Sequence, residues 1–205
     1  MYEIERAEVA YFMKRLYERG LTTTSGGNVS MRVGAEHVLV TPSLLDKGRL
    51  TGEQVGIVTM NGENLTPGLI TSMETSMHLA IYKKRPEIRS VVHAHPTWST
   101  TFTAMEKDIN TRLIAESWAI LGTPVRAAYA LQGSPRLAEN VAQAAKGSDV
   151  ILISNHGIVT LGTSLLQAFD RMEVLEAAAR MTIVTTIMKD SNELKADQLQ
   201  EITGI

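Results

Sequence analysis

Cysteine is absent from the 205 residues of this chain, which excludes disulfides, thiolate nucleophiles and cysteine-bound metals. Any metal site must therefore use histidine, aspartate or glutamate. Aromatic residues are scarce at 5%, and no apolar run reaches the roughly 20 residues that a membrane helix needs. The opening residues Met1 to Arg6 are charged and lack the apolar core of a signal peptide. We therefore expect a cytoplasmic protein without a membrane partner.

The charge of the chain is close to balanced. A formal net charge of -2 gives no reason to expect nucleic acid or a membrane surface as partner. Hydrophobic residues make up 44% and charged residues 20%, which is the mix of an ordinary globular protein. No repeat, low-complexity tract or linker divides the sequence. We expect a single domain over residues 1–205, with a polar tail at 190–205 that frays or docks on a neighbour.

Hydrophobic periodicity predicts a mixture of helices and short strands. A strong helix signature follows the N-cap residue Ser134, where Pro135 takes the first helical position and Gly147 lies beyond the end. Other helices are expected at residues 4–17, 73–84, 96–105 and 165–188, and strands at 29–33, 37–41, 55–60, 90–95, 124–130 and on both sides of 155–157. The alternation of helices and strands indicates one α/β domain.

Three histidines fall at the ends of predicted strands. His93 and His95 project to the same side of their strand, about 6.6 Å apart along the backbone, because side chains on a strand alternate faces. His156 lies at the tip between two apolar strands and can supply the third ligand that zinc, cobalt or manganese would need. We predict that these three side chains converge on one divalent cation, whereas His37 begins a strand and His78 lies on a helix.

A structural alternative exists for these histidines, because a His-x-His pair alone is more often two ordinary, partly buried side chains. The position of all three at strand ends, where α/β proteins place their chemistry, favours the metal. Two other metal-site patterns do not fit. A cupin would need a glutamate shortly after the pair, but Glu106 follows a helical segment, and the segment HAHPTW excludes the His-x-His-x-Asp-His pattern of metallohydrolases.

A carboxylate lies upstream of the histidine pair. Glu74 is near the start of a predicted helix and follows the hydroxyl residues Thr71 and Ser72. The helix dipole stabilises a carboxylate at this position, so a purely structural role is one interpretation. The other is a general base, because a metal-bound carbonyl acidifies the adjacent C–H and a carboxylate within reach can remove that proton.

Two segments carry neutral hydrogen-bond donors suited to an anion. TSGGNVS offers free backbone N–H groups with the side chains of Ser25 and Asn28, and Thr41 to Ser43 closes a strand with similar chemistry. Neither segment contains the glycine-lysine-serine element of a Walker loop, so neutral donors would have to bind the anion. Each segment alone is more often a plain turn.

In their order and spacing, the segments SGGNVS, TPS, SMETSMH, VVHAHP and SNHGIVTLG resemble the class II aldolase/adducin head family, over roughly residues 5 to 190. The resemblance implies a three-layer α/β/α domain with a mixed, mostly antiparallel sheet, usually assembled as a homotetramer with active sites between subunits. It also implies Glu74 as the acid/base and a divalent metal, most often Zn²⁺ with Mn²⁺ or Co²⁺ as alternatives. By the match, His93, His95 and His156 hold the metal, and Ser25, Gly27, Asn28, Thr41, Ser43 and Ser72 hold a phosphate.

The reaction that the resemblance implies is reversible retro-aldol cleavage of a phosphorylated ketose, of the L-fuculose 1-phosphate type, to dihydroxyacetone phosphate and an aldehyde. Within the same family, a pentulose-phosphate 4-epimerase and a methylthioribulose 1-phosphate dehydratase are alternatives. A non-catalytic, adducin-like assembly domain is a further alternative. It is disfavoured because a silent domain does not need three histidines and Glu74.

Several positions depart from the aldolase pattern. Met73 stands where the aldolases commonly have a serine, and its side chain cannot donate to a phosphate. The aldolase pattern also uses one tyrosine in the middle of the chain and one near its carboxyl end. Here Ile114 stands near the first of these positions, and Tyr129 is the last tyrosine. The proton donor on the aldehyde side is therefore unassigned, and Glu116 is either an alternative carboxylate or a helix surface residue.

Overall fold

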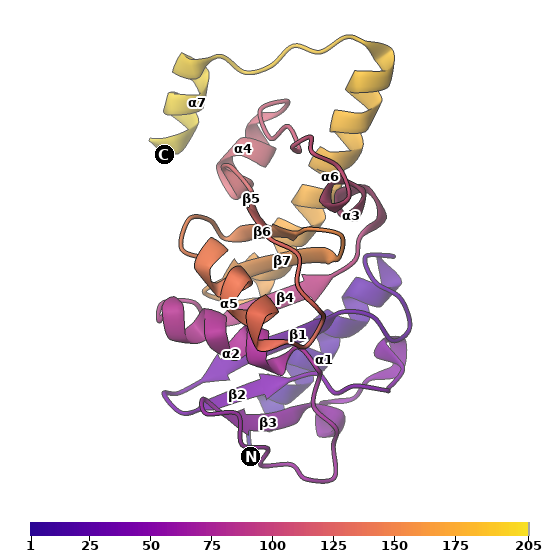
Figure 1. Cartoon of the computed structure of the whole chain (residues 1–205), viewed down its shortest axis with the longest axis vertical. Coiled ribbons are helices and arrows are strands. Elements are labelled where there is room, and N and C mark those ends of the chain that lie inside the picture. The colour runs from indigo at the N-terminus through magenta and orange to yellow at the C-terminus, as the bar shows by residue number, and fades with distance from the viewer. Residues whose placement is uncertain (205) are drawn as a thin grey trace.

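The computed structural model describes residues 1–204 and contains a seven-stranded sheet in the order β3-β2-β1-β4-β7-β6-β5 (Figure 1). All neighbouring strands are antiparallel except β5 and β6. The strands are β1 Asn28–Val33, β2 His37–Val40, β3 Gly56–Thr59, β4 Ser90–Ala94, β5 Val125–Ala127, β6 Val150–Ile153 and β7 Gly157–Gly162. Each expected strand is present, although the one expected at 124–130 is regular over only 3 residues.

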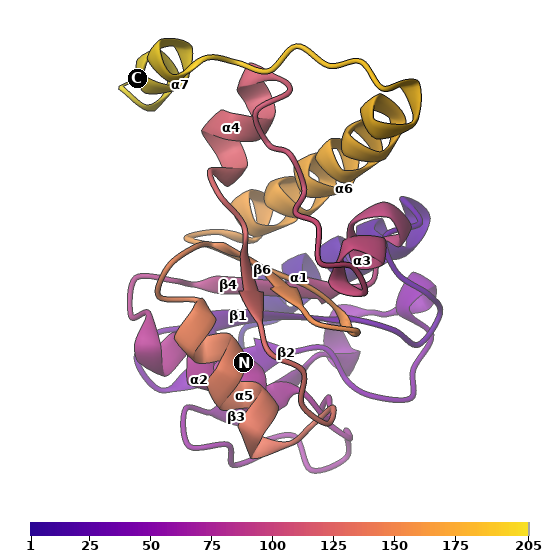
Figure 2. The same ribbon diagram turned by 45° about the horizontal axis from the view of Figure 1, so that its top comes forward.

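Helices cover both faces of this sheet. Helices α2 and α5 pack together on one face, and α1 and α6 lie on the other (Figures 1 and 2). Each helical layer encloses its own apolar cluster against the sheet. The helices are α1 Glu3–Glu18, α2 Thr75–Lys84, α3 Thr97–Thr103, α4 Ala115–Leu121, α5 Pro135–Ala144, α6 Leu165–Met188 and α7 Ala196–Thr203. The structure thus confirms the three-layer α/β/α fold with a mixed, mostly antiparallel sheet.

Two of these helices are absent from the sequence-based expectation. Helix α4 follows an irregular segment, and α7 lies in the tail that was expected to fray or dock on a neighbour. Figure 2 shows α7 away from the sheet, beside α4, where Trp118 Nε1 donates to the Leu199 carbonyl at 3.2 Å. None of the helices in residues 1–204 combines the length and the apolar character that crossing a membrane requires.

The order of the central strands determines where the predicted site residues meet. Because β4 runs antiparallel to both β1 and β7, its carboxyl end lies beside the first residues of those strands. Asn28 at the start of β1 is paired with His93, and Ala94 at the end of β4 is paired with Ile158 near the start of β7. Three adjacent strand ends therefore bring together residues that are far apart in the sequence.

Candidate metal centre

Three imidazoles converge at these strand ends. His93 is buried within β4, His95 follows the end of that strand, and His156 lies in the turn between β6 and β7. Their ring centroids are separated by 4.8 Å (His93–His95), 5.0 Å (His93–His156) and 5.5 Å (His95–His156). One nitrogen from each ring lies within 4.8 Å of the others. The expectation that the three side chains come together is met.

Local backbone features place these rings. Asn155, in the turn before His156, has a left-handed φ of 53°, and its N–H donates to the Thr103 carbonyl at 2.9 Å. A side chain at Gly157 would put its Cβ 2.5 Å from Cδ2 of His95, so only glycine leaves room for that ring. The segment Asn-His-Gly is therefore required by the approach of two histidines as well as by the turn.

Hydrogen bonding leaves nitrogen lone pairs free in the centre of the cluster. The Nδ1–H of His93 donates to the Ile158 carbonyl at 2.9 Å, which fixes the ring and directs Nε2 inward. Nε2 of His93 and Nε2 of His156 are both buried and make no hydrogen bond within residues 1–204. Buried polar nitrogens without a partner are costly, and a metal ion is one partner that would satisfy them.

Glu74 closes the fourth side of the cluster. Its side chain is only 2% exposed, with Oε2 lying 3.1 Å from His93 Nε2 and Oε1 lying 3.3 Å from His156 Nε2. Asn28 Nδ2 donates to Oε2 at 2.9 Å. Glu74 is also the N-cap residue of α2, which directs its side chain from the helix start toward the strand ends. The carboxylate therefore lies directly against two of the three imidazoles.

The electrostatics of the cluster favour an anion at Glu74. Burial raises the pKa of the Glu74 carboxyl, but the adjacent His93 imidazole and the hydrogen bond from Asn28 outweigh burial and hold this pKa well below its ordinary value. Burial, together with the proximity of the His93 and His156 rings, lowers the pKa of His95 to about 3, so its imidazole is neutral, as a metal ligand must be.

The donor set fits a divalent transition metal. Three imidazole nitrogens with a carboxylate at the remaining side match the ligand types that zinc takes in proteins. Cobalt and manganese accept the same ligands. The ligand types therefore suit a divalent metal ion. The buried Nε2 atoms of His93 and His156, which have no hydrogen-bond partner within residues 1–204, are available to bind it.

The segments assigned to an anion lie beside this cluster and are tied to one another. Lys47 N–H donates to the Thr24 carbonyl at 2.9 Å, and Ser43 N–H donates to the Ile70 carbonyl at 2.8 Å. The first bond joins the loop at 24–27 to Lys47, whose Nζ donates to the Pro42 carbonyl, and the second joins the segment 41–43 to residues 70–72. At Gly27 φ is 67°, and a Cβ there would lie 2.7 Å from the His93 carbonyl oxygen, so this loop touches β4.

The individual side chains assigned to an anion differ in their availability. Ser25 is exposed, and Ser43 and Ser72 are half-buried. By contrast, Thr41 is fully buried, and its Oγ1 accepts from Val29 N–H at 3.1 Å. The Asn28 amide is occupied at both ends, because its Oδ1 accepts from His78 Nε2.

Two residues linked to the cluster were missed by sequence reasoning. His78 and Lys47 are both buried, His78 as the next partner of Asn28 and Lys47 with Nζ donating to the Pro42 carbonyl. The spacing of Glu74 and His78 by one helical turn was a signal that could have found the first. No comparable periodicity marks Lys47.

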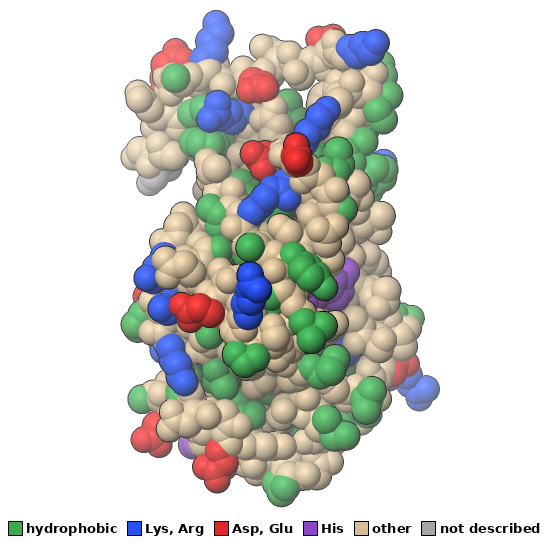
Figure 3. Space-filling view, viewed as in Figure 1, with side chains coloured by type: hydrophobic (Ala, Val, Ile, Leu, Met, Phe, Trp, Pro, Cys, Tyr) green, Lys and Arg blue, Asp and Glu red, His purple; other side chains and the backbone are tan. Residues whose placement is uncertain are grey.

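The other residues considered are exposed, and none of them belongs to the cluster of three histidines. Glu116 is exposed in the first turn of α4, an element that packs against α6 and α7. Ile114 and Tyr129 are also exposed. Figure 3 shows histidine at the surface of the molecule, flanked by hydrophobic side chains.

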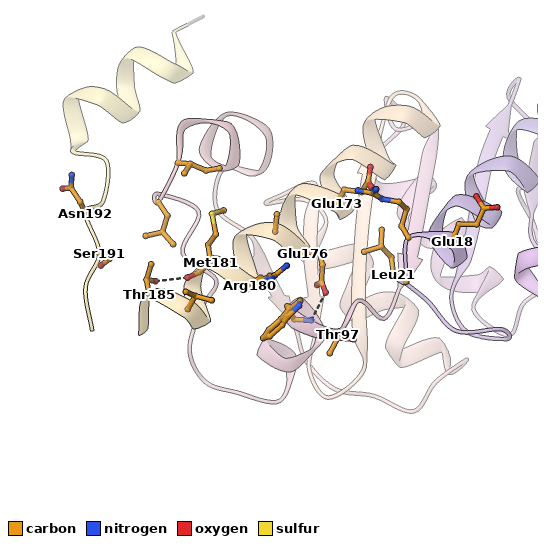
Figure 4. Close-up of a pocket in the computed structure, with 17 residues that line it drawn as sticks. Glu18, Leu21, Thr97, Glu173, Glu176, Arg180, Met181, Thr185, Ser191 and Asn192 are labelled. Atoms are coloured by element: carbon orange, nitrogen blue, oxygen red, sulfur yellow. Dashed lines mark hydrogen bonds and ion pairs between the residues drawn. The ribbon is translucent and has the colours of Figure 1, made fainter. Parts of the chain in front are cut away.

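A cavity of about 1040 Å³ lies between the end of α1, helix α3 and the carboxyl half of α6 (Figure 4). Thr97 and Trp98 line it, and Glu176 accepts from the backbone N–H of Trp98 at 2.9 Å. None of the three clustered histidines lines this cavity, and neither does Glu74. We therefore place the chemistry at the histidine cluster, where the reactive groups are, rather than in this cavity.

Comparison with known proteins agrees with this architecture. Residues 7–183 match the model of the class II aldolase and adducin N-terminal domain family. An L-fuculose phosphate aldolase of Methanococcus maripaludis is 36% identical over 91% of this chain and 100% of its own length. A 3-oxo-tetronate 4-phosphate decarboxylase of Haemophilus influenzae is 36% identical over 82% of this chain and 81% of its own. The crystal structure of YgbL from Escherichia coli superposes with a TM-score of 0.91 at 28% identity, covering 98% of both chains.

Proposed function

The chain belongs to the class II aldolase and adducin N-terminal domain family, and from this premise we propose that it is a metal-dependent aldolase. It would cleave a phosphorylated ketose of the L-fuculose 1-phosphate type into dihydroxyacetone phosphate and an aldehyde, reversibly. The observation that carries the proposal is the buried Glu74 carboxylate, which lies 3.1 Å from His93 Nε2 at the centre of three converging imidazoles.

His93, His95 and His156 would hold the metal, for which we propose Zn²⁺ ahead of Mn²⁺ or Co²⁺. When bound, a divalent cation there would act as a Lewis acid that stabilises negative charge on the ketone oxygen of the substrate. The neutral imidazoles add no negative charge of their own. Because His93 is locked through its Nδ1–H on the Ile158 carbonyl, at least one ligand is oriented in advance.

Glu74 would move the proton at the carbon that loses its bond. In cleavage of a ketose 1-phosphate, the bond between C3 and C4 breaks, the C4 hydroxyl loses its proton to become the aldehyde, and C3 gains a proton. Glu74 is ionised and buried at the cluster, so it can accept this proton from dihydroxyacetone phosphate in the direction of condensation and return it in cleavage.

The phosphate would lie in the joined loops at 24–27, 41–43 and 70–72. Ser25, Ser43 and Ser72 have hydroxyl groups near the surface, and Gly27 would offer its backbone N–H from a left-handed conformation. Thr41 and Asn28 would contribute by supporting these loops, since their side chains already have buried partners. This arrangement would bind the anion through neutral donors, as the sequence predicts.

Decarboxylation of a phosphorylated keto acid is the second candidate. The relative from Haemophilus influenzae is named for this activity and has the same 36% identity to the chain as the aldolase, over 82% of the chain against 91%. Loss of CO₂ from a 3-oxo-tetronate 4-phosphate also leaves dihydroxyacetone phosphate, so Glu74 would deliver the same proton. Decarboxylation needs no proton acceptor on an aldehyde side. The exposed positions of Tyr129 and Glu116 are therefore no obstacle to it.

One experiment distinguishes these activities. Metal-loaded protein is incubated with L-fuculose 1-phosphate, a pentulose 5-phosphate, methylthioribulose 1-phosphate and 3-oxo-tetronate 4-phosphate, and dihydroxyacetone phosphate, aldehyde and CO₂ are measured. Aldehyde released with dihydroxyacetone phosphate supports the aldolase, and CO₂ supports the decarboxylase. Epimer or dehydrated product would support one of the other family activities. Absence of stoichiometric metal together with absence of any turnover would support a non-catalytic assembly domain and overturn the proposal.

We also place the protein in the cytoplasm as a homotetramer with active sites between subunits. Hydrophobic side chains on the loop before Glu74 support this assembly, because Ile70 is 65% exposed and Met73 is 67% exposed. Exposed apolar groups beside a catalytic centre are typical of surfaces that another subunit covers.

A further inference from the structure

A continuous chain of polar side chains runs from Glu74 into the core between β1 and α2. Asn28 Nδ2 is 2.9 Å from Glu74 Oε2, and Asn28 Oδ1 is 2.5 Å from His78 Nε2. Ser30 Oγ is 2.6 Å from His78 Nδ1 and 2.7 Å from the Tyr82 hydroxyl. All five side chains are at most 3% exposed. Apolar side chains could fill the same volume without needing hydrogen-bond partners. The presence of five buried polar side chains here therefore calls for an explanation.

The polar residues of β1 and α2 face one another because they recur at nearly the same distance along the strand and along the helix. Glu74, His78 and Tyr82 are spaced by one helical turn each, which is about 6 Å along α2. Asn28 and Ser30 are alternate residues of β1, which is about 6.6 Å along the strand. The residues between and beside them, Val29, Met31 and Val33, belong to the apolar cluster on the opposite face of the sheet. The polar face of β1 is thus aligned with one face of α2.

The hydrogen bonds between these five polar side chains all run in one donor-to-acceptor direction. Asn28 presents its NH₂ to Oε2 of Glu74 and its carbonyl oxygen to Nε2 of His78. His78 Nε2 must therefore carry a proton. Burial, with the charge on His93 adding to its effect, lowers the pKa of His78 to about 3, so the ring is neutral and its Nδ1 accepts. Ser30 then donates to Nδ1 and accepts from the Tyr82 hydroxyl at 2.7 Å, a shorter contact than the 3.4 Å from that hydroxyl to the Arg89 carbonyl.

We propose that His78 is a positioning residue for the reaction, which holds the Asn28 amide with its NH₂ toward Glu74 and so fixes the carboxylate that moves the proton. Ser30 and Tyr82 select the tautomer of His78 in which Nε2–H faces Asn28. A rotated Asn28 amide would place its oxygen against Oε2 of Glu74 and its NH₂ against Nε2–H of His78. The role in catalysis rests on the proposed function, whereas the direction of the hydrogen bonds does not.

The proposal is tested with two variants of the same residue. His78→Phe removes both ring nitrogens, whereas His78→Gln keeps an amide NH₂ that can donate to Asn28. The readout is the rate at which metal-loaded protein exchanges the hydroxymethyl proton of dihydroxyacetone phosphate in D₂O, followed by NMR. For His78→Phe we expect kcat to fall of order 10- to 100-fold with KM and metal content unchanged, because a misplaced catalytic group loses its orientation. His78→Gln should recover most of the loss.

A matched control separates positioning from general loss of stability. Thr160 is fully buried on β7, and its hydroxyl donates to the Ala168 carbonyl at 2.7 Å, a bond that involves none of the polar side chains between β1 and α2. Thr160→Val should lower the unfolding temperature without changing kcat. Equal kcat losses in His78→Phe and His78→Gln, or unchanged kcat in His78→Phe, would overturn the proposal. If His78→Phe does not fold, Tyr82→Phe is used instead, because it removes the first donor in the series of hydrogen bonds. An unchanged kcat in Tyr82→Phe would overturn the proposal.

A second measurement does not depend on activity. In protein with ¹⁵N-labelled histidine, the ring of His78 should show a protonated Nε2 and an unprotonated Nδ1. The opposite tautomer would reverse the chain and overturn the proposal. If wild-type protein fails to exchange dihydroxyacetone phosphate, the proposed function fails by itself, and the tautomer still decides the direction of the hydrogen bonds.

Discussion

Glu74 is the residue at which the two polar parts of the site meet. One oxygen faces His156 and the other is shared between His93 and Asn28. The histidines and this glutamate could be predicted because their residue types and order are uncommon. The hydrogen bonds of the Asn28 amide could not be predicted, because its second partner, His78, lies 50 positions along the chain and on another element. Contacts of that range depend on strand and helix placement, which local patterns do not determine.

The metal ligands give the first prediction at this scale. Replacing His93 with alanine removes the ligand that is fully buried and anchored on the Ile158 carbonyl. We expect both bound metal and turnover to be lost, measured by elemental analysis after dialysis and by product formation. His37→Ala is the matched control, because that ring contacts Tyr2 and lies outside the cluster. Metal retained at wild-type stoichiometry in His93→Ala would contradict the site.

Glu74 gives the second prediction. In Glu74→Gln the amide oxygen can still accept from Asn28, so the fold and the three imidazoles should be retained. Proton exchange at dihydroxyacetone phosphate should fall of order 100-fold or more, because the general base is removed. Metal content, determined in the same samples, should be unchanged. Wild-type exchange rates in this variant would assign the proton to another group.

At the scale of elements, the periodic segments were predictable, whereas the short helices α4 and α7 were not. Helices α1 and α6 show apolar residues at helical spacing over many turns, and each strand is an apolar run between turn residues. Helix α4 has 7 residues, of which only Ser117 and Leu121 are buried. Helix α7 has 8 residues and buries only Leu199. So few inward-facing positions do not establish a period, and tertiary contact decides these helices.

The N-cap of helix α5, which the sequence predicts correctly at Ser134, can be tested by its contribution to stability. Ser134 Oγ accepts from the Leu137 N–H at 3.2 Å, which satisfies one of the free donors at the helix start. Ser134→Ala should lower the free energy of unfolding by about 1 kcal/mol, measured by urea denaturation. Ser191→Ala, an exposed position outside the helices, serves as the control. Equal stabilities of the two variants would show that the cap contributes nothing measurable.

At the scale of the whole molecule, the arrangement of the sheet is what the residues alone could not give. Alternation of strands and helices would suit a mainly parallel sheet. Here only β5 and β6 are parallel, and they are the pair joined through helix α5. The other neighbours are antiparallel, and β4 lies between β1 and β7, which are distant in sequence. Only the family resemblance supplied this arrangement, because strand order depends on long-range pairing.

Assembly is the remaining prediction for the whole molecule. Ile70 is 65% exposed, and its loop leads directly to Ser72 and Glu74, so a subunit that covers it would also border the site. We expect light scattering to give four times the 22.4 kDa of a single chain. Ile70→Asp should reduce both the mass and the turnover, since a charge in a covered apolar contact is costly. Ile4→Asp, at an 82% exposed position in the first turn of α1, should change neither. A monomer with full activity at all concentrations would show that one chain is sufficient for catalysis, and the exposed loop would then need another explanation.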